Sequence, residues 1–234
     1  EADMDFMLMT ESPGRTMDIY LGQNKSRESR LLFDAGVKMA MIHKIKVKNF
    51  GAFNNEEAKK SSILVGLHQT YRSFIQTGLE ENLNRLVNFN IVEARKVKAM
   101  AEVFKNYNFE PTDGPRLIHN DFADWNLLTD GRTITGVLDW DECHGGDPIA
   151  DLACWSTFYN LERLEHFIKG YKSISALPKD YDDRFHYYRL RYTISKMALR
   201  AKRYLVDKSA SVKERLEVGK RALTEELRYF KLNC

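Results

Sequence analysis

The sequence of 234 residues predicts a mostly helical α+β protein with a small β-hairpin at its centre. Segments on both sides of the middle of the chain carry apolar residues at helical spacing. Between residues 116 and 140 the pattern changes to short β-type runs around a turn signal. No repeat, low-complexity tract or Pro/Gly/Ser-rich linker interrupts the chain, so the simplest organisation is one continuous domain.

The N-terminal part is expected to contain one strand and two long helices. Phe6 to Thr10 has the pattern of a short buried strand that ends at the turn Ser12-Pro13-Gly14. Apolar residues on nearly all sides of a helix from Leu31 to His43 predict that it lies buried in the centre. Residues 91 to 107 form an amphipathic helix. The alternating lysines of residues 44 to 48 follow the buried helix directly, so we interpret them as a helix exit and loop, not as a strand with a phosphate-binding lysine.

The β-type runs occupy residues 116–119, 126–129 and 134–140, with Asp130-Gly131 as a turn signal. Asp147-Pro148 then starts another helix, with the aspartate as N-cap and the proline at the first helical position. Two apolar stripes predict that the tail is helical again. Their residues are Leu190, Ile194, Met197, Ala201 and Leu205 in one stripe, and Val212, Leu216, Leu223, Leu227 and Phe230 in the other.

Composition excludes several classes of protein. With 43% hydrophobic and 29% charged residues the chain is neither disordered nor embedded in a membrane, and its apolar runs are far shorter than the ~20 residues of a spanning helix. Three cysteines without a CxxC pair argue against a disulfide framework and a structural zinc site. The acidic start does not have the pattern of a secretory signal. A cytoplasmic protein is therefore expected.

The net charge of +3 conceals an acidic segment. Residues 121 to 151 contain eight acids and one base, so this segment carries −7 and the remainder of the chain +10. The basic residues of the C-terminal part are spread around helices whose apolar positions already have a packing role, which indicates solvated faces. Neither a nucleic acid nor a membrane is expected as a partner, and the oligomeric state stays open.

Four residues form a pattern that carries chemistry: His119, Asp121, Asn126 and Asp139. Phosphoryl transfer from ATP needs a carboxylate that orients the attacking hydroxyl and accepts its proton. It also needs oxygen ligands that hold magnesium on the phosphates. Asp121, Asn126 and Asp139 supply that set.

Asn126 and Asp139 can share one ion only if two antiparallel strands bring the ends of the segment together. A tight two-residue turn at positions 130 and 131 would pair Asn126 with Thr135. Asp139 would then lie four residues further on, roughly 13 Å away at about 3.3 Å per residue. We therefore predict a wider connection that spans about residues 130 to 134.

These residues and their surroundings resemble a known family. The run His119-Asn-Asp121-Phe-x-x-x-Asn126 is followed by Val137-Leu-Asp139-Trp140, Gly146-Asp147-Pro148 and Asp151-Leu152-Ala153. This order is similar to that of the aminoglycoside phosphotransferase and choline kinase superfamily, whose members share the two-lobed protein-kinase-like fold. The likeness covers essentially the whole chain in element order, and its specific motifs lie in residues 117 to 155.

The resemblance implies a role for each motif residue. Asp121 would be the catalytic base, and His119 would support the catalytic loop. Asn126 and Asp139 would bind Mg²⁺ and, through it, the nucleotide, which is ATP or GTP. Asp147 and Asp151 would be helix-start residues that brace the loop.

The start of the chain also resembles a part of this family. Leu8 to Gly14 is similar to the hinge, where main-chain groups near Thr10 and Glu11 would contact adenine. On this resemblance residues 1–14 are a hinge segment that leads from a missing N-terminal lobe. Residues 15–234 are then the helical C-terminal lobe, with catalytic and metal-binding loops at 117–155.

The parts that grip phosphate are not found in the sequence. It contains no G-x-G loop and no GxxxxGK[ST] motif. Three interpretations stay open. The chain is the C-terminal lobe of a small-molecule kinase and inactive alone, or a lone lobe that binds substrate without turnover, or a degenerate interaction protein. Retention of Asp121, Asn126 and Asp139 disfavours the third.

The acceptor is expected to be a small molecule. Only residues 140 to 146 separate Asp139 from the next helix cap, which leaves no room for the peptide platform of a protein kinase. The acidic segment would attract a cationic acceptor, with Asp124, Asp141 and Glu142 as candidate contacts. A competing interpretation stays equally open: these acids only bind magnesium and cap helices. An aminoglycoside-like antibiotic is favoured, and a choline- or homoserine-type metabolic kinase is the alternative.

Overall fold

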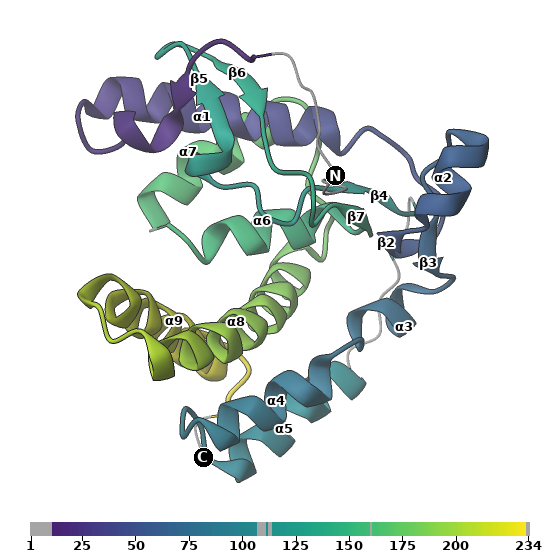
Figure 1. The fold of residues 1–234 in the computed structure, drawn as a ribbon, viewed down its shortest axis with the longest axis vertical. Helices are drawn as coiled ribbons and strands as arrows, with labels where there is room; N and C mark the ends of the chain where they lie inside the picture. Colours follow the sequence, from purple (N-terminus) through teal and green to yellow (C-terminus); the bar gives the residue numbers. More distant parts are fainter. Residues whose placement is uncertain (1–10, 107–110, 112–113, 160, 233–234) are drawn as a thin grey trace, which may run out of the picture.

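The computed structural model describes residues 11–106, 111, 114–159 and 161–232. The described part is mostly helical with two small antiparallel sheets, which confirms the predicted α+β class (Figure 1). The predicted strand from Phe6 to Thr10 lies outside the described residues, as does Tyr107 at the end of the predicted amphipathic helix.

Helix α1 (Lys25–Ile42) packs along α7 (Leu161–Lys172). Gly36 on α1 and Gly170 on α7 allow this close approach, because a Cβ at either position would collide with a carbonyl oxygen of the facing helix. The predicted helix is thus present, but its burial on nearly all sides is wrong. The neighbouring elements cover only part of its surface and leave Phe33 and Met41 exposed. Residues 44 to 48 form a loop with isolated bridges, as predicted.

The first sheet has the strand order β1 (Arg15–Thr16), β5 (Leu127–Thr129) and β6 (Ile134–Val137). Leu127 pairs with Val137 and Thr129 pairs with Ile134, so four residues connect β5 and β6. The Asp130 side chain accepts hydrogen bonds from the N–H groups of residues 132 and 133 within this connection. The prediction of a wide connection is confirmed, and a tight turn at 130 and 131 is excluded.

The second sheet has the order β3 (Gly66–His68), β2 (Phe50–Phe53), β7 (His144–Gly146) and β4 (Arg116–Ile118). Helix α2 (Asn55–Ser61) connects β2 to β3. The sequence pattern reveals β4 but not its three partners. These partners are three or four residues long and rich in glycine, which leaves too few positions for an alternating pattern.

The C-terminal helices confirm their prediction. Helix α6 (Pro148–Ser156) begins with Asp147, whose side chain accepts the Ile149 N–H at 3.0 Å, and with Pro148 in its first turn. Helix α8 (Tyr181–Val206) packs against α6, against α4 (Leu79–Asn88) and against α9 (Ala210–Tyr229). Of the predicted stripes, Leu205 is exposed at the end of α8 and Phe230 is half-buried, while the other members are buried.

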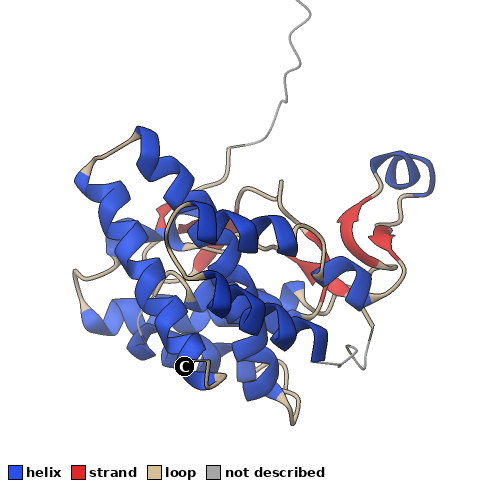
Figure 2. Cartoon of the chain, turned by 90° about the horizontal axis from the view of Figure 1, so that it is seen from below, coloured by secondary structure: helices blue, strands red, loops and turns tan. Residues whose placement is uncertain are grey.

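Two further α-helices lie in the described part. Helix α3 (Tyr71–Ile75) follows the second sheet, and α5 (Ala94–Asn106) packs against α4. Figure 2 shows the strands in small groups beside and among these helices. No helix of the described part is long and apolar enough to cross a membrane. Cys143 and Cys154 are free thiols.

Candidate active site

The loop between β4 and β5 carries His119, Asp121 and Asn126, whereas Asp139 follows β6. One buried carboxylate holds the first part of the loop in place. Asp151 lies in the first turn of α6 and is buried. Its Oδ2 atom accepts the N–H of His119 at 2.8 Å, and its Oδ1 atom accepts the N–H of Asn120 at 2.7 Å. These are the contacts of a residue that braces the loop, which is the role that the resemblance implies for Asp151.

His43 is the second partner of this carboxylate. Its Nε2 atom lies 3.1 Å from Asp151 Oδ2, and its Nδ1 atom lies 3.0 Å from the hydroxyl of Tyr171. Burial alone would raise the pKa of Asp151, but the hydrogen bond and charge of His43 and the N–H of His119 together lower it. In the sequence, His43 is marked only as the end of the predicted helix from Leu31, because no ligand spacing surrounds it.

The ring of His119 ties the loop to the end of β6. Its Nε2 atom lies 2.9 Å from the carbonyl oxygen of Leu138, and its Nδ1 atom lies 3.3 Å from the Asp121 nitrogen. Because the Asp121 N–H is a donor and the Leu138 carbonyl an acceptor, we assign the proton to Nε2. The ring also packs against Trp140 with centroids 4.6 Å apart. Both ring nitrogens therefore serve positioning contacts.

Asn126 connects the end of the loop to Asp121. Its Nδ2 atom donates to the Asp121 carbonyl oxygen at 2.9 Å and to Asp121 Oδ2 at 3.0 Å. The Leu138 N–H donates to the Asn126 carbonyl oxygen at 2.8 Å, so Asp139 follows directly after the residue opposite Asn126. The strand register thus brings together the two residues that sequence reasoning placed at one ion.

Two residues of this region have left-handed backbones. Asn120 has a φ of 70° and Asp139 a φ of 59°, values that residues with a Cβ seldom adopt. Such conformations persist where the surrounding structure fixes them, and they cluster at functional sites. For Asn120 the fixing contact is the bond of its N–H to Asp151.

The donor set of this region fits a magnesium ion. Both hydrogen bonds of the Asn126 side chain use Nδ2, which leaves its Oδ1 atom for a cation. Asp139 is exposed and Asp121 partly exposed, so both carboxylates are accessible from solvent. Oxygen ligands in small number suit Mg²⁺, which keeps several of its waters and takes others from phosphates. Among the described residues no group of three or more His, Cys, Asp or Glu side chains is placed to hold a metal.

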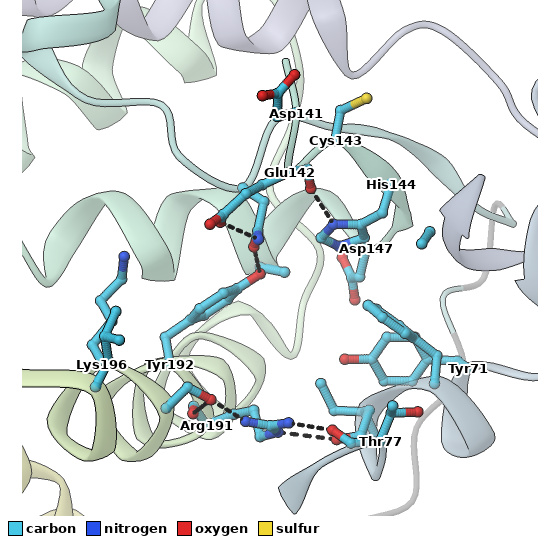
Figure 3. Close-up of a pocket in the computed structure, with 17 residues that line it drawn as sticks. Tyr71, Thr77, Asp141, Glu142, Cys143, His144, Asp147, Arg191, Tyr192 and Lys196 are labelled. Atoms are coloured by element: carbon cyan, nitrogen blue, oxygen red, sulfur yellow. Dashed lines mark hydrogen bonds between the residues drawn. The ribbon is translucent and has the colours of Figure 1, made fainter. Parts of the chain in front are cut away.

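A cavity of about 480 Å³ lies beside the loop, between α8 and the segment that leads into α6 (Figure 3). Two of the predicted acceptor contacts, Asp141 and Glu142, line it. Asn120 donates from Nδ2 to Glu142 Oε2 at 3.0 Å and accepts from the hydroxyl of Tyr192 at 2.5 Å. Sequence analysis missed Tyr192, because on α8 it reads as one more aromatic residue of a packed helix.

The opposite wall of the cavity is fixed by an arginine. Arg191 donates to the carbonyl oxygens of Ile75 and Thr77 and to the hydroxyl of Ser195 (Figure 3). These contacts join α8 to α3 and to the residues after it. The hydrogen bonds of its guanidinium therefore go to the protein, and the side chain helps to shape the wall of the cavity.

The remaining predicted site residues lie elsewhere. Asp124 is only 9% exposed and is not among the residues that line the cavity. Burial raises its pKa, although a side-chain hydrogen bond with Tyr159 lowers it in part, and the Asp124 N–H donates to the Tyr159 hydroxyl at 2.7 Å. Glu11 is exposed in the segment that runs toward β1, where the Pro13 carbonyl oxygen accepts a bond from Thr135 Oγ1 at 2.8 Å. Thr10 lies outside the described residues.

Solved structures of similar fold are aminoglycoside phosphotransferases. A thermostable mutant of APH(4)-Ia, in a ternary complex with AMP-PNP and hygromycin B, has a TM-score of 0.61 and 20% sequence identity, over 91% of this chain and 70% of that chain. A putative aminoglycoside phosphotransferase from Ralstonia eutropha JMP134 has a TM-score of 0.64 and 12% identity, over 95% and 71%. APH(2'')-IIa in complex with gentamicin has a TM-score of 0.52 and 16% identity, over 93% and 69%.

The search of curated proteins gave no match. The family model that matches describes a phosphotransferase enzyme family, and it covers residues 1–190. That range includes the loop between β4 and β5, the hairpin of β5 and β6, and the helix that carries Asp151. The chain therefore belongs to this phosphotransferase enzyme family, which makes it a small-molecule kinase.

Proposed function

We propose that this protein transfers the γ-phosphoryl group of ATP or GTP to a hydroxyl of a small cationic molecule, with Asp121 as the base. The observation that carries this proposal is the hydrogen bond of 3.0 Å from Asn126 Nδ2 to Asp121 Oδ2. This bond fixes the carboxylate while leaving it partly exposed. A group that accepts a proton from a bound hydroxyl must be both positioned and accessible in this way.

The other residues of the loop act by positioning. Asn126 and Asp139 would hold Mg²⁺, and the ion would neutralise the charge that develops on the phosphates. His119 keeps the loop against the end of β6, and Asp151 holds the backbone of residues 119 and 120. Because phosphoryl transfer depends mainly on positioning and electrostatic stabilisation, these contacts would contribute directly to the rate.

The acceptor would enter the cavity beside the loop. Asp141 and Glu142 supply negative charge at its lining, which favours a cationic group. The complexes of APH(4)-Ia with hygromycin B and of APH(2'')-IIa with gentamicin support an aminoglycoside as the first class to test. Choline-like amino alcohols and homoserine are the second. Asp124 is buried outside the cavity, so we do not include it among the contacts.

The nucleotide would contact the start of the chain. On the family resemblance, main-chain groups near Thr10 and Glu11 bind adenine, residues 1–14 form the hinge, and residues 15–234 form the C-terminal lobe. Glycine-rich and lysine-bearing parts that grip phosphate would precede residue 1. Reading the upstream coding sequence tests this division, because about 80 to 100 further residues with a glycine-rich strand pair and a lysine are expected.

Turnover is tested with the product of the complete coding sequence. ADP release is measured with aminoglycosides, amino alcohols, homoserine and sugars as acceptors. Asp121→Ala should lower kcat by about a thousandfold, within the range that a positioned base contributes. Asp182→Ala, at an exposed position in the first turn of α8, is the matched control and should retain full activity. Undiminished turnover by Asp121→Ala would refute the assignment of the base.

A second candidate function follows from the phosphate-gripping motifs that the sequence lacks. A lobe without them would bind its small molecule without transferring phosphate. Calorimetric binding of an acceptor, with no ADP release from a protein in which Asp121 is intact, would favour this binding module over the kinase.

A further inference from the structure

A second groove, also of about 480 Å³, lies between α8 and α9 and reaches the catalytic loop. Trp125, which immediately precedes Asn126, contributes to its lining, as do residues of α8 and α9. Lys196 and Leu199 line both this groove and the cavity beside the loop. In Figure 3, Lys196 stands at the side of the cavity away from Tyr71.

One wall of the groove is aromatic and accessible. The rings of Trp125 and Phe158 meet edge to face with centroids 5.1 Å apart, and Lys196 Nζ lies 4.2 Å from the centroid of Phe158. Trp125 is 44% exposed and Leu199 is 65% exposed, although both are large apolar side chains. Val212 and Val218 of α9 also line the groove. Its lining therefore offers an apolar surface on which a flat or aliphatic group would be buried.

The charged groups of the groove are unbalanced. Lys196, Arg200 and Arg203 contribute from α8, Arg215 contributes from α9, and Glu214 is the only acid in the lining. Within the residues that the structure describes, none of these four cations lies within salt-bridge distance of a carboxylate. Four cations and one acid along an apolar surface are the complement of an anionic ligand.

Arg200 shows that this arrangement is built into the helix packing. Its guanidinium lies against Gly219 of α9, where an added Cβ would come within 3.0 Å of Nη1. Burial, followed by the charge of Arg215, lowers the pKa of Arg200. The protein thus keeps two guanidinium groups near each other at a cost that an anion between them would remove.

From this geometry we propose that the groove between α8 and α9 binds a small organic anion with an aromatic or aliphatic body, such as an aryl carboxylate or aryl phosphate. The body would lie on Trp125, Phe158 and Leu199, and the anionic group would contact Arg200 and Arg215. This site is distinct from the acidic end of the cavity at Asp141 and Glu142. It does not depend on the proposed transfer reaction, because binding is measured without turnover.

Anilinonaphthalene sulfonate is the probe, since it joins an aromatic body to an anionic group. N-phenylnaphthylamine is its matched control, because it has the same rings without the sulfonate. Saturable binding of the sulfonate to one site, with quenching of Trp125 fluorescence, is expected, and the neutral compound should bind at least about tenfold more weakly. Binding should weaken as salt rises, and excess Mg-ATP should not displace the probe.

Two substitutions locate the site. Arg200→Gln and Arg215→Gln should each weaken sulfonate binding by about tenfold. Arg215 is exposed, so its substitution tests the proposal even if Arg200→Gln disturbs folding. Lys213→Gln removes the same charge from an exposed position of α9 outside the groove and should leave binding unchanged. Trp125→Phe should abolish the quenching.

Four outcomes would overturn the proposal. Equal binding of the two compounds would show that the anionic group is not recognised. An equal loss in Lys213→Gln would show diffuse attraction to a basic surface. Displacement by Mg-ATP would place the probe in the nucleotide site. An absence of saturable binding would leave the groove without a small-molecule ligand of this class.

To test whether the groove is separate from the acceptor site, the same probe is added to the transfer assay. Competition with the acceptor would contradict the assignment of a distinct site, whereas an unchanged acceptor KM would support it. Neither result affects the test of Asp121.

Discussion

The catalytic loop and the groove between α8 and α9 treat charge in opposite ways. Around the loop the buried charges are paired: Asp151 with His43, and Asp147 with Arg184 and Tyr188. In the groove, Lys196, Arg200, Arg203 and Arg215 converge with no carboxylate within salt-bridge distance among the described residues. The pairs of the first region fix a backbone, whereas the cations of the second form no salt bridge within the described residues, and Lys196 contacts the ring of Phe158 instead.

This difference teaches how each region should respond to mutation. Removing one member of a buried pair leaves the other charge buried without compensation, which is costly. A cation of the groove has a like-charged neighbour and no salt-bridge partner. Removing it relieves repulsion, so the free energy of unfolding should change little. Substitutions of the buried pairs near the loop should therefore lower the free energy of unfolding. Substitutions of the groove cations should instead weaken binding of the proposed anion, and the variants below separate these two effects.

The largest effect is expected from Asp151→Ala. It would leave His43 without its buried partner and the N–H groups of residues 119 and 120 without acceptors. The free energy of unfolding should fall by about 3–5 kcal/mol, measured by urea denaturation at neutral pH. Glu165→Ala, at an exposed site on α7, removes the same charge as a control and should change it little. A loss below about 1 kcal/mol in Asp151→Ala would contradict the bracing role.

The pH dependence of this contribution has a defined sign. The folded pKa of Asp151 lies below its usual value of 3.8, so its ionised form is favoured in the folded protein. Its stabilising contribution is then fully present above the unfolded pKa and is lost as pH falls through the lower, folded pKa. The difference between the wild type and Asp151→Ala should stay constant near neutral pH and shrink below about pH 4. A difference that vanished already near neutral pH would contradict this assignment.

The hairpin and the motif residues were predictable because they depend on local signals. Asn126 and Asp139 flank a turn, so counting residues between them was enough to predict the width of the connection that the register of β5 and β6 confirms. Asp147 was predictable as a cap because a proline follows it. Each of these inferences uses residues that are close in the chain.

The second sheet and the supporting residues depend on contacts between distant segments. His43 and Asp151 are separated by 108 residues, and Tyr192 and Asn120 by 72. Neither pair leaves a pattern in one sequence, because His43 ends a helix and Tyr192 lies within one, each as an ordinary residue of its helix. The strands β2 and β7 were hidden for a related reason, since glycines at Gly51 and Gly145 permit a close pairing but carry no side-chain period.

A matched pair of arginine substitutions on α8 tests the comparison directly. Arg184 is buried and donates to Asp147 and Asp180, so Arg184→Gln should lower the free energy of unfolding by about 3 kcal/mol. Arg200→Gln removes the same charge from the same helix, and it should leave this free energy unchanged or slightly higher because the repulsion from Arg215 is lost. Thermal and urea unfolding measure both. Equal losses in the two variants would mean that the groove cations are structural after all.

The smallest effect is expected from Tyr192→Phe, which removes one hydroxyl that joins α8 to the loop. That hydroxyl orients Asn120, whose amide holds Glu142 at the cavity, so the variant should raise the KM for a cationic acceptor by about three- to tenfold. The kcat and the unfolding free energy should change less, because the backbone of Asn120 stays bonded to Asp151. Tyr204→Phe, a half-buried tyrosine on the same helix, is the control and should leave the KM unchanged. An unaltered KM in Tyr192→Phe would mean that the orientation of Glu142 does not matter for acceptor binding, whereas a fall in kcat alone would place the effect of the hydroxyl on the loop instead of the cavity.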